Sequence, residues 1–239
     1  PAWHPCDVLQ GDRPKEMPEV TPKASDTDAA ADLPPVSMKL DLSSLVRAAA
    51  SALADAEPLL TKYDTIVGDG DCGITMKRGA TGVLEQMDKG NLVADHPVSL
   101  CAGLADAVSD SMGGTSGVLL ELFFRKMSST LSRASSIGKA EMCEAFEAGV
   151  NAISLYGGAK AGSRTMLDAL FPAAATLVET QSLQEAAAKA REGADSTAAM
   201  KSADAGRSNY LSEETLEGTP DPGACAAAIV LEALAKESS

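Results

Sequence analysis

The segment MGGTSGVLLELFFRKM, Met112–Met127, shows most directly how this chain folds. Its second half carries apolar side chains at helical intervals, at Leu119, Leu120, Phe123, Phe124 and Met127. Side chains three and four residues apart lie on one face of an α-helix, and an apolar face of this kind is usually buried in a core. The segment therefore predicts an amphipathic helix that begins just after a glycine-rich stretch.

The chain from about residue 40 onward has the same helical character. A second set of apolar residues repeats at helical intervals at Leu167, Leu170, Phe171, Ala174 and Leu177. Aromatic residues make up only 3% of the chain, and runs of alanine, the residue with the highest helix propensity, recur. No segment of useful length alternates apolar and polar residues as a half-buried strand does. The sequence therefore predicts an all-α fold of antiparallel amphipathic helices.

We expect eight helices after residue 40. Their approximate ranges are 41–62, 74–88, 97–111, 115–134, 139–156, 164–180, 183–203 and 222–237. The one long stretch without a helical pattern in this part of the chain runs from Asp204 to Asp221. Because long connections inside a compact domain often serve in binding or catalysis, this stretch is a candidate functional loop.

Composition argues against several classes of function. The net charge of −14 argues against a nucleic-acid-binding surface, which requires clustered lysine and arginine. The same charge means that a nucleotide would have to bind together with cations. No stretch approaches the roughly 18 apolar residues of a membrane span, and no signal peptide opens the chain. The five scattered cysteines lack a C-x-x-C pair, which favours reduced thiols in a cytoplasmic protein over a disulfide framework or a zinc site.

The first 38 residues differ from the rest. Residues 11–38 contain five prolines among charged and small residues, which predicts an extended, solvated linker. We interpret residues 1–10, PAWHPCDVLQ, as the tail of an upstream domain, and residues 39–239 as the helical domain. Because the chain begins with proline and not with methionine, we expect a fragment or a processed piece of a longer protein.

A loop rich in aspartate and glycine precedes the second predicted helix. The sequence DTIVGDGDCG places Asp64, Asp69 and Asp71 within eight residues. An EF-hand counted from Asp69 would have Gly73 at position 5 and Ala80 at position 12, where oxygen ligands are required. A P-loop is excluded because its lysine is missing. Three carboxylates can instead hold Mg²⁺, which would bridge them to the phosphates of a nucleotide. The alternative is an acidic turn that only caps the next helix.

The glycine-rich start of the opening segment is a second candidate site. The N-terminus of a helix offers free N–H groups and the positive end of the helix dipole to an anion, and the hydroxyls of Thr115 and Ser116 add donors. The alternative is an ordinary N-cap. Two further stretches, Tyr156–Asp168 and Asp221–Ala224, are compatible with nucleotide contacts and equally with helix starts. We interpret Arg164 as a surface charge, with a phosphate contact or an acidic partner as alternatives.

Six motifs then occur in one order on this helical background. They are GDGDCG (68–73), GGTSG (113–117), YGG (156–158), RTMLDAL (164–170), GRSNYL (206–211) and DPGA (221–224). As a set they closely resemble the C-terminal, L-type nucleotide-binding domain of ATP-dependent dihydroxyacetone (glycerone) kinases, a family that includes the triokinase/FMN cyclases. The resemblance covers the chain from about residue 40 to its end, and it implies an eight-helix barrel.

The resemblance also implies roles for individual residues. Asp64, Asp69 and Asp71 match the aspartates that hold the magnesium ions, two of them, which bridge the phosphates of ATP. The residues that match nucleotide contacts are Asp69, Gly70, Asp71, Cys72, Thr115, Ser116, Gly157, Thr165, Met166, Asp221, Pro222 and Gly223. Three positions depart from the usual pattern, because Cys72 stands for a frequent histidine, Thr115 for a frequent serine and Ser163 for a frequent aspartate.

The resemblance finally implies that part of the active site lies elsewhere. In this family a histidine of a separate N-terminal domain holds the substrate, and neither His4 nor His96 lies in a matching motif. We therefore expect phosphate transfer from Mg·ATP to dihydroxyacetone or glyceraldehyde only with a substrate-binding domain, in the same full-length chain or in a dimer mate. Alternatives are FAD-AMP lyase activity that forms cyclic FMN at the same site, a non-catalytic nucleotide-retaining phosphorelay or regulatory subunit, and a fatty-acid-kinase-type domain.

Overall fold

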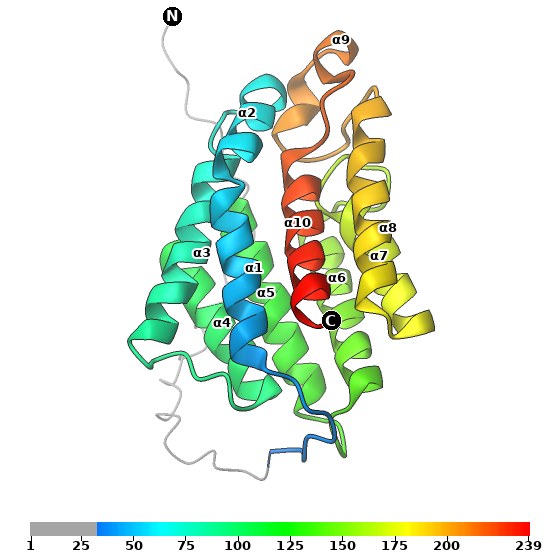
Figure 1. Ribbon diagram of the computed structural model, residues 1–239. Coiled ribbons are helices and arrows are strands. Elements are labelled where there is room, and N and C mark those ends of the chain that lie inside the picture. The colour runs from blue at the N-terminus through cyan, green and yellow to red at the C-terminus, as the bar shows by residue number, and fades with distance from the viewer. Residues whose placement is uncertain (1–32) are drawn as a thin grey trace, which may run out of the picture. The chain divides into compact units, whose positions relative to one another are not determined.

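The computed structural model describes residues 33–239, which form helices and no β-strand (Figure 1). The long helices are α1 (Leu42–Asp55), α2 (Glu57–Val67), α3 (Cys72–Asp88), α4 (Pro97–Ser111), α5 (Gly114–Leu131), α6 (Lys139–Gly157), α7 (Leu167–Thr180), α8 (Leu183–Ser196) and α10 (Pro222–Glu237). Three short helices, η1 (Thr197–Ala199), η2 (Arg207–Tyr210) and α9 (Glu213–Leu216), lie between α8 and α10. The predicted all-α class is confirmed. The predicted tail, residues 1–10, and most of the predicted linker lie outside the described residues.

The long helices close into a ring of antiparallel neighbours. From α3 to α8 each helix packs against the next, α10 packs against both α8 and α1, and α1 packs against α3. The helix α2 continues from α1 and lies beside α3 and α10 (Figure 1). Because directions alternate around the ring, α3, α5, α7 and α10 all begin at one end, drawn uppermost in Figure 1. We call it the site end and the opposite end the far end.

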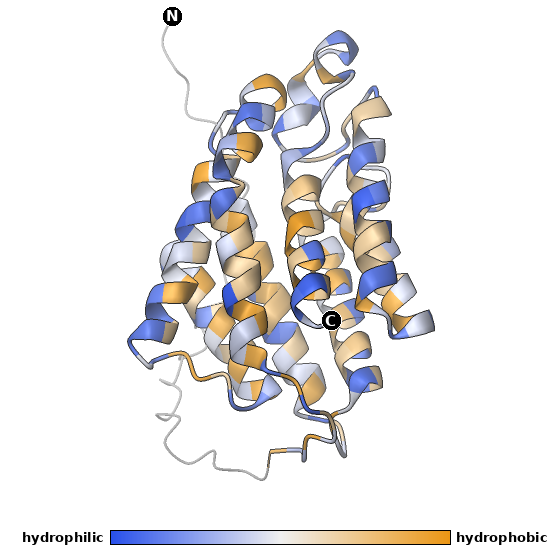
Figure 2. Ribbon diagram, viewed as in Figure 1, coloured by the Kyte–Doolittle hydropathy of each residue, from blue (hydrophilic) through white to orange (hydrophobic). Residues whose placement is uncertain are grey.

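Apolar side chains fill the interior of this ring. The face of α5 predicted from its spacing points inward, since Phe123 and Met127 are buried and Phe123 packs edge to face against Phe146. The helices show apolar and polar stripes along their length (Figure 2). The interior also contains an apolar cavity of about 280 Å³, with Met76, Phe123 and Met166 among the side chains in its wall.

Three predicted helix boundaries differ from the structure. The predicted helix 41–62 is two helices, because Pro58 near the start of α2 has no N–H to continue the helical hydrogen bonding from α1. The predicted helix 183–203 ends at Ser196, and the turn η1 follows it. The helix predicted from residue 164 begins at Leu167, because Arg164 has a left-handed backbone with φ of 60°.

The last residues of the predicted linker contact the helical domain. The carbonyl oxygen of Pro35 accepts a hydrogen bond from the Ile137 amide at 2.8 Å, and the Ser37 amide donates to the Ile137 carbonyl at 2.8 Å. The ring of His96 also lies 2.9 Å from the Pro34 carbonyl oxygen, through Nε2. These contacts lie at the far end, at the turn between α5 and α6 and the start of α4. The linker as a whole stays a prediction.

None of the helices within residues 33–239 is both long and apolar enough to cross a membrane. The thiols of Cys72, Cys101, Cys143 and Cys225 are free.

Candidate nucleotide and metal site

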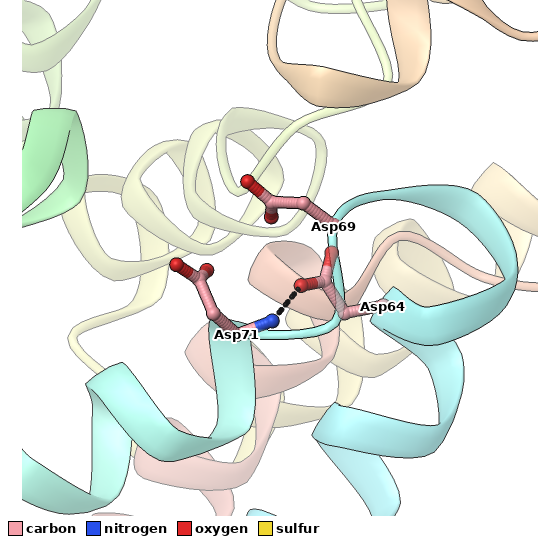
Figure 3. A group of neighbouring side chains, drawn as sticks. All are labelled: Asp64, Asp69 and Asp71. Atoms are coloured by element: carbon pink, nitrogen blue, oxygen red, sulfur yellow. Dashed lines mark hydrogen bonds between the residues drawn. The ribbon is translucent and has the colours of Figure 1, made fainter.

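The aspartate-rich segment lies at the site end, between α2 and α3. Asp64 belongs to the last turns of α2, and Asp69 and Asp71 follow in the short connection Gly68–Asp71, which we call the aspartate loop. Carboxylate oxygens from these three residues all lie within 4.8 Å of one another (Figure 3). Asp64 is buried, whereas Asp69 and Asp71 are exposed. The structure thus brings the predicted triad into one cluster.

Asp64 fixes the shape of the aspartate loop. Its Oδ2 accepts hydrogen bonds from the amides of Asp71 at 2.8 Å and Cys72 at 2.9 Å, so it caps α3 from the preceding helix. Asp71 occupies the N-cap position and makes no capping bond with its own side chain. Helix capping, the alternative to a metal site, therefore accounts for one oxygen of Asp64. It gives no role to the carboxylates of Asp69 and Asp71, which stay free for other partners.

Two glycines are required by the path of this loop. Gly70 has a φ of 80°, which side-chain-bearing residues rarely adopt. A Cβ at Gly68 would overlap the Asp64 carboxylate. The glycines therefore let the backbone turn directly against the acidic side chain.

The cluster is electrostatically crowded. The pKa of Asp71 is raised by partial burial first, and then by the neighbouring charges of Asp69 and Asp64. Arg207 of η2 partly compensates this negative charge, because its Nε forms an ion pair with Asp69 Oδ2 at 3.1 Å. Hard oxygen ligands gathered this closely are the donor set that Mg²⁺ prefers, and a divalent cation would relieve their repulsion.

The start of α5 presents free hydrogen-bond donors at the same end. Gly113 is the N-cap with an extended backbone, and Gly114 has a φ of 68°. Thr115 and Ser116 follow in the first turn, and among residues 33–239 neither hydroxyl makes a hydrogen bond. The ordinary N-cap alternative is not what this geometry shows, because no side chain caps α5. The guanidinium of Arg78 lies beside Gly113, close to the position a Cβ would take.

The remaining predicted contacts lie at the ends of α6, α7 and α10. Gly157 is the last residue of α6 and allows a close approach to Leu119 of α5. Thr165 and Met166 precede α7, and Met166 lies next to the backbone of Gly223 in the first turn of α10. The contact of Met166 with Gly223 joins the segments before α7 and at the start of α10. Within residues 33–239 no hydrogen bond joins Thr115 or Gly157 to the three aspartates.

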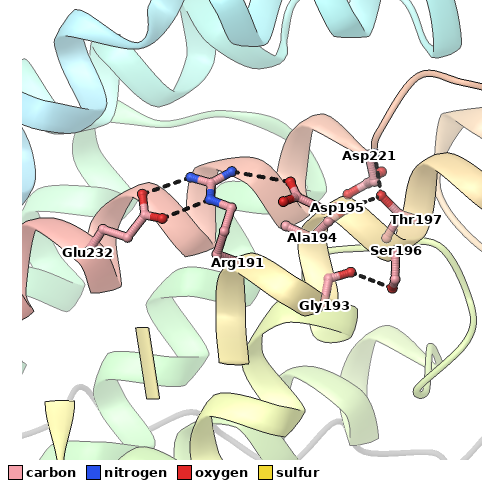
Figure 4. A network of polar contacts seen from close by, with 8 residues as sticks. All are labelled: Arg191, Gly193, Ala194, Asp195, Ser196, Thr197, Asp221 and Glu232. Carbon is pink, nitrogen blue, oxygen red and sulfur yellow. Dashed lines mark hydrogen bonds and ion pairs between the residues drawn. The ribbon is translucent and has the colours of Figure 1, made fainter. Parts of the chain in front are cut away.

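Asp221 starts α10 from a buried position. Its Oδ1 accepts from the Ala224 amide at 2.7 Å. Its own amide donates to Thr197 Oγ1 at 2.7 Å, and Figure 4 shows this pair. Burial raises the pKa of Asp221 to about 7, against the lowering effects of the Ala224 amide and of Arg164. The same region is braced by Arg191 of α8, whose guanidinium donates two 2.8 Å hydrogen bonds to Glu232 of α10 (Figure 4).

The Cys72 thiol lies close enough to the carboxylates of Asp64, Asp71 and Asp221 to be affected by their charges. Burial, and then the charges of Asp64, Asp221 and Asp71, raise its pKa to about 12. The thiol therefore stays protonated near neutral pH, and Cys72 is a neutral neighbour of the cluster.

Two arginines have partners in the structure that differ from the sequence-based predictions. Arg164 is 1% exposed, so its interpretation as a surface charge is wrong. Its hydrogen bonds go to residues 208–219, at least 44 positions along the chain, and no local pattern predicts such partners. Arg207 received no role, although it stands in the GRSNYL motif within the stretch marked as a candidate functional loop. Arg207 is the single basic residue between Asp204 and Asp221, and this feature of the sequence could have indicated an acidic partner. We refer to residues 204–219 as the long loop.

Comparison with known proteins places this chain in a family. The family described as "DAK2 domain" matches residues 66–236. A putative 3,4-dihydroxy-2-butanone kinase of Solanum lycopersicum is 40% identical over 78% of this chain and 33% of its own length. The dihydroxyacetone kinase of Citrobacter freundii is 37% identical over 80% of this chain and 34% of its own length. The triokinase/FMN cyclase of Homo sapiens is 37% identical over 77% of this chain and 32% of its own length.

A solved structure agrees with these relatives. The crystal structure of the C. freundii dihydroxyacetone kinase in complex with AMP-PNP and Mg²⁺ superposes with a TM-score of 0.69 at 31% identity, covering 93% of this chain and 38% of that one. This chain thus spans about a third of the length of the curated relatives it matches. The resemblance inferred from the six motifs is confirmed, and the chain belongs to the DAK2 domain family.

Proposed function

We propose that this domain binds Mg·ATP at the site end and is the phosphate-donating half of a dihydroxyacetone (glycerone) kinase. The observation that carries the proposal is the cluster of Asp64, Asp69 and Asp71, built into the turn between two helices of a DAK2 domain. The relative from C. freundii with this fold was crystallised with AMP-PNP and Mg²⁺.

Charge explains why the metal is needed. A carboxylate and a phosphate repel each other by about 4 kcal/mol at 4 Å in a protein-like dielectric, so aspartates alone would exclude ATP. Magnesium ions, two in the arrangement we favour, would neutralise charge on the phosphates and on the carboxylates together. Asp69 and Asp71 offer exposed oxygens to the metal, and Asp64 offers the oxygen that does not cap α3.

Helix ends would hold the nucleotide. Four ring helices begin at the site end, and each positive dipole end favours an anion there. Thr115 and Ser116 lie in the first turn of α5, and their hydroxyls make no hydrogen bond within residues 33–239. They would donate to phosphate oxygens. The other contacts would come from Gly70, Cys72, Gly157, Thr165, Met166, Asp221, Pro222 and Gly223.

The acceptor of the phosphate would be held by another domain. His96 cannot serve, because its Nδ1 accepts from the Val98 amide and its Nε2 contacts Pro34 at the far end. His4 lies outside the described residues. Since the relatives are about three times as long as the matching part of this chain, we assign dihydroxyacetone or glyceraldehyde to a separate substrate-binding domain, in the same full-length chain or in a dimer mate.

Calorimetric titration with ATP tests the metal-bridged site. We expect the wild-type chain to bind ATP with Mg²⁺ and to bind it at least tenfold more weakly without. Asp69→Ala should remove most of the magnesium-dependent affinity. Glu179→Ala, which removes the same charge from an exposed position in the last turn of α7, should leave it unchanged. Equal affinity in all of these titrations would refute the proposal.

A second candidate function uses the same site. The human relative is named triokinase/FMN cyclase, which favours FAD-AMP lyase activity with cyclic FMN as product. Adding the substrate domain of the C. freundii enzyme and measuring ketose phosphate tests the kinase, whereas AMP release from FAD tests the lyase. Mg·ATP binding with neither product would support a nucleotide-retaining or regulatory subunit instead.

A further inference from the structure

Arg164 is a buried cation that binds one distant segment. Its side chain is 1% exposed, and it lies in the connection between α6 and α7. Its Nη1 donates to Ser208 Oγ at 3.0 Å, and its Nη2 donates to the Thr219 carbonyl at 2.6 Å. Both acceptors belong to the long loop, so one side chain holds that loop near its two ends.

Burying Arg164 in this way is energetically unfavourable if the side chain serves only to stabilise the fold. Within residues 33–239 Arg164 forms no ion pair, and its Nε has no hydrogen-bond partner. Its backbone adopts a left-handed conformation that non-glycine residues rarely take. The charges of Asp221 and Asp168 act on Arg164 only from beyond ion-pair distance. A buried charge whose hydrogen bonds go to neutral oxygens is less favourable than a well-packed apolar side chain of similar size. Strain and desolvation of this kind are common next to functional sites.

Ser208 connects Arg164 to the aspartate loop. Its hydroxyl accepts from Arg164 and donates to the Val67 carbonyl oxygen at 2.6 Å. Val67 is the last residue of α2, and Gly68 begins the aspartate loop directly after it. Arg207, the neighbour of Ser208, pairs with Asp69, the second residue of that loop.

We propose that Arg164 is a positioning residue that acts through Ser208, holding the long loop against the aspartate loop with Arg207 beside the metal-binding carboxylates. This inference deepens the proposed function and rests on it for its consequence on Mg·ATP. A loop held in place before the ligand arrives loses less conformational entropy on binding, so the latch should raise affinity. We call the contacts Arg164–Ser208–Val67 the latch.

Hydrogen exchange tests the latch without any ligand. Arg164→Asn removes the guanidinium but keeps a residue that tolerates a positive φ, and Ser208→Ala removes only the bridging hydroxyl. Both should raise exchange in residues 204–219 at least tenfold and leave α5 unchanged. Arg133→Asn, at an exposed arginine just after α5 at the far end, is the matched control. Unchanged exchange in the long loop in folded Arg164→Asn and Ser208→Ala would overturn the proposal.

A double-mutant titration tests whether the latch acts through Arg207. Arg164→Asn should weaken Mg·ATP binding about tenfold in the wild-type background. In the Arg207→Ala background the same change should have little further effect, because the group it positions is gone. An equal loss in both backgrounds would mean a merely structural role. Absence of Mg·ATP binding in the wild-type chain would refute the proposed function alone, and the exchange result would still decide the latch.

Discussion

The two loops that meet at the site end are held in opposite ways. The aspartate loop is a four-residue connection fixed from within, since Asp64 of the preceding helix bonds the two amides that begin α3. The long loop has no regular helix beyond two short ones and is fixed from outside, by a buried arginine from another connection. The short loop thus carries its carboxylates on a turn held by the helix before it, and the long loop carries Arg207, which pairs with Asp69 at 3.1 Å.

The largest effect is expected from breaking the internal support of the short loop. Asp64→Ala leaves two amides without an acceptor and removes a proposed metal ligand, so Mg·ATP affinity should fall about 100-fold. Stability should fall by about 1–2 kcal/mol, the usual cost of a lost cap. Asp64→Asn keeps an acceptor for the amides without the charge, so it should recover stability and not affinity. Denaturant unfolding measures the change in stability, and calorimetric titration measures the change in Mg·ATP affinity. Full affinity in Asp64→Ala would contradict the proposed role of Asp64.

Asp221, the N-cap of α10 just beyond the long loop, should give a pH-dependent effect on stability. The pKa of Asp221 is raised to about 7 in the folded chain, from a normal 3.8. Asp221 therefore binds a proton more tightly in the folded chain than in the unfolded chain. The protonated side chain favours the folded state at low pH, and this stabilisation is lost as pH rises through about 7. Asp221→Asn keeps the capping oxygen and cannot titrate. Its stability relative to wild type should rise by a few kcal/mol between about pH 4 and pH 7.

Thermal or denaturant unfolding of both proteins across that pH range measures the difference. A constant difference would show that folding leaves the pKa of Asp221 unchanged, and a fall with pH would show that folding lowers it.

A smaller effect is expected from the hydroxyl that anchors the end of the long loop. Thr197 Oγ1 accepts from the buried Asp221 amide and donates to the Ala194 carbonyl at 2.6 Å. Thr197→Val keeps the shape and leaves the buried Asp221 amide without its acceptor, whereas the Ala194 carbonyl keeps the backbone N–H of residue 197, so the free energy of unfolding should fall by about 1–3 kcal/mol. Thr197→Ser keeps the hydroxyl and is the control. Equal stability of the two variants would mean that these hydrogen bonds contribute nothing.

The smallest effect on stability is expected from replacing two glycines, one in each loop, that have similar backbone angles. Gly70 in the aspartate loop and Gly218 in the long loop have φ values of 80° and 83°. Alanine at either position should cost about 1–2 kcal/mol of stability through the same backbone strain. Gly70→Ala should also weaken Mg·ATP binding more than Gly218→Ala does, because it shifts the proposed metal ligands directly, whereas Gly218 acts only through the long loop. Equal loss of affinity in both variants would contradict this order.

The sequence predicted the helices better than their ends. Apolar spacing identified α5 because Phe123 and Met127 report a buried face over several turns. The break at Pro58 was readable from local chemistry and was missed, since the apolar pattern continues across it. The aspartate cluster was predictable because a short connection keeps Asp64 near Asp69 and Asp71. The latch was not predictable, because Ser208 and Thr219 reach Arg164 only after the ring of helices has closed.

The even number of ring helices has a consequence for the connectivity of the fold. Because directions alternate, α1 begins and α10 ends at the far end, where Ser44 Oγ donates to Glu237 Oε1 at 2.7 Å. The ends of the helical ring are thus neighbours, away from the aspartate loop. A short peptide could join them, and new termini could be opened in the exposed turn after α3. Such a circular permutant would keep every contact at the site end, which makes the ring, and not the order of its helices along the chain, the unit that carries the site.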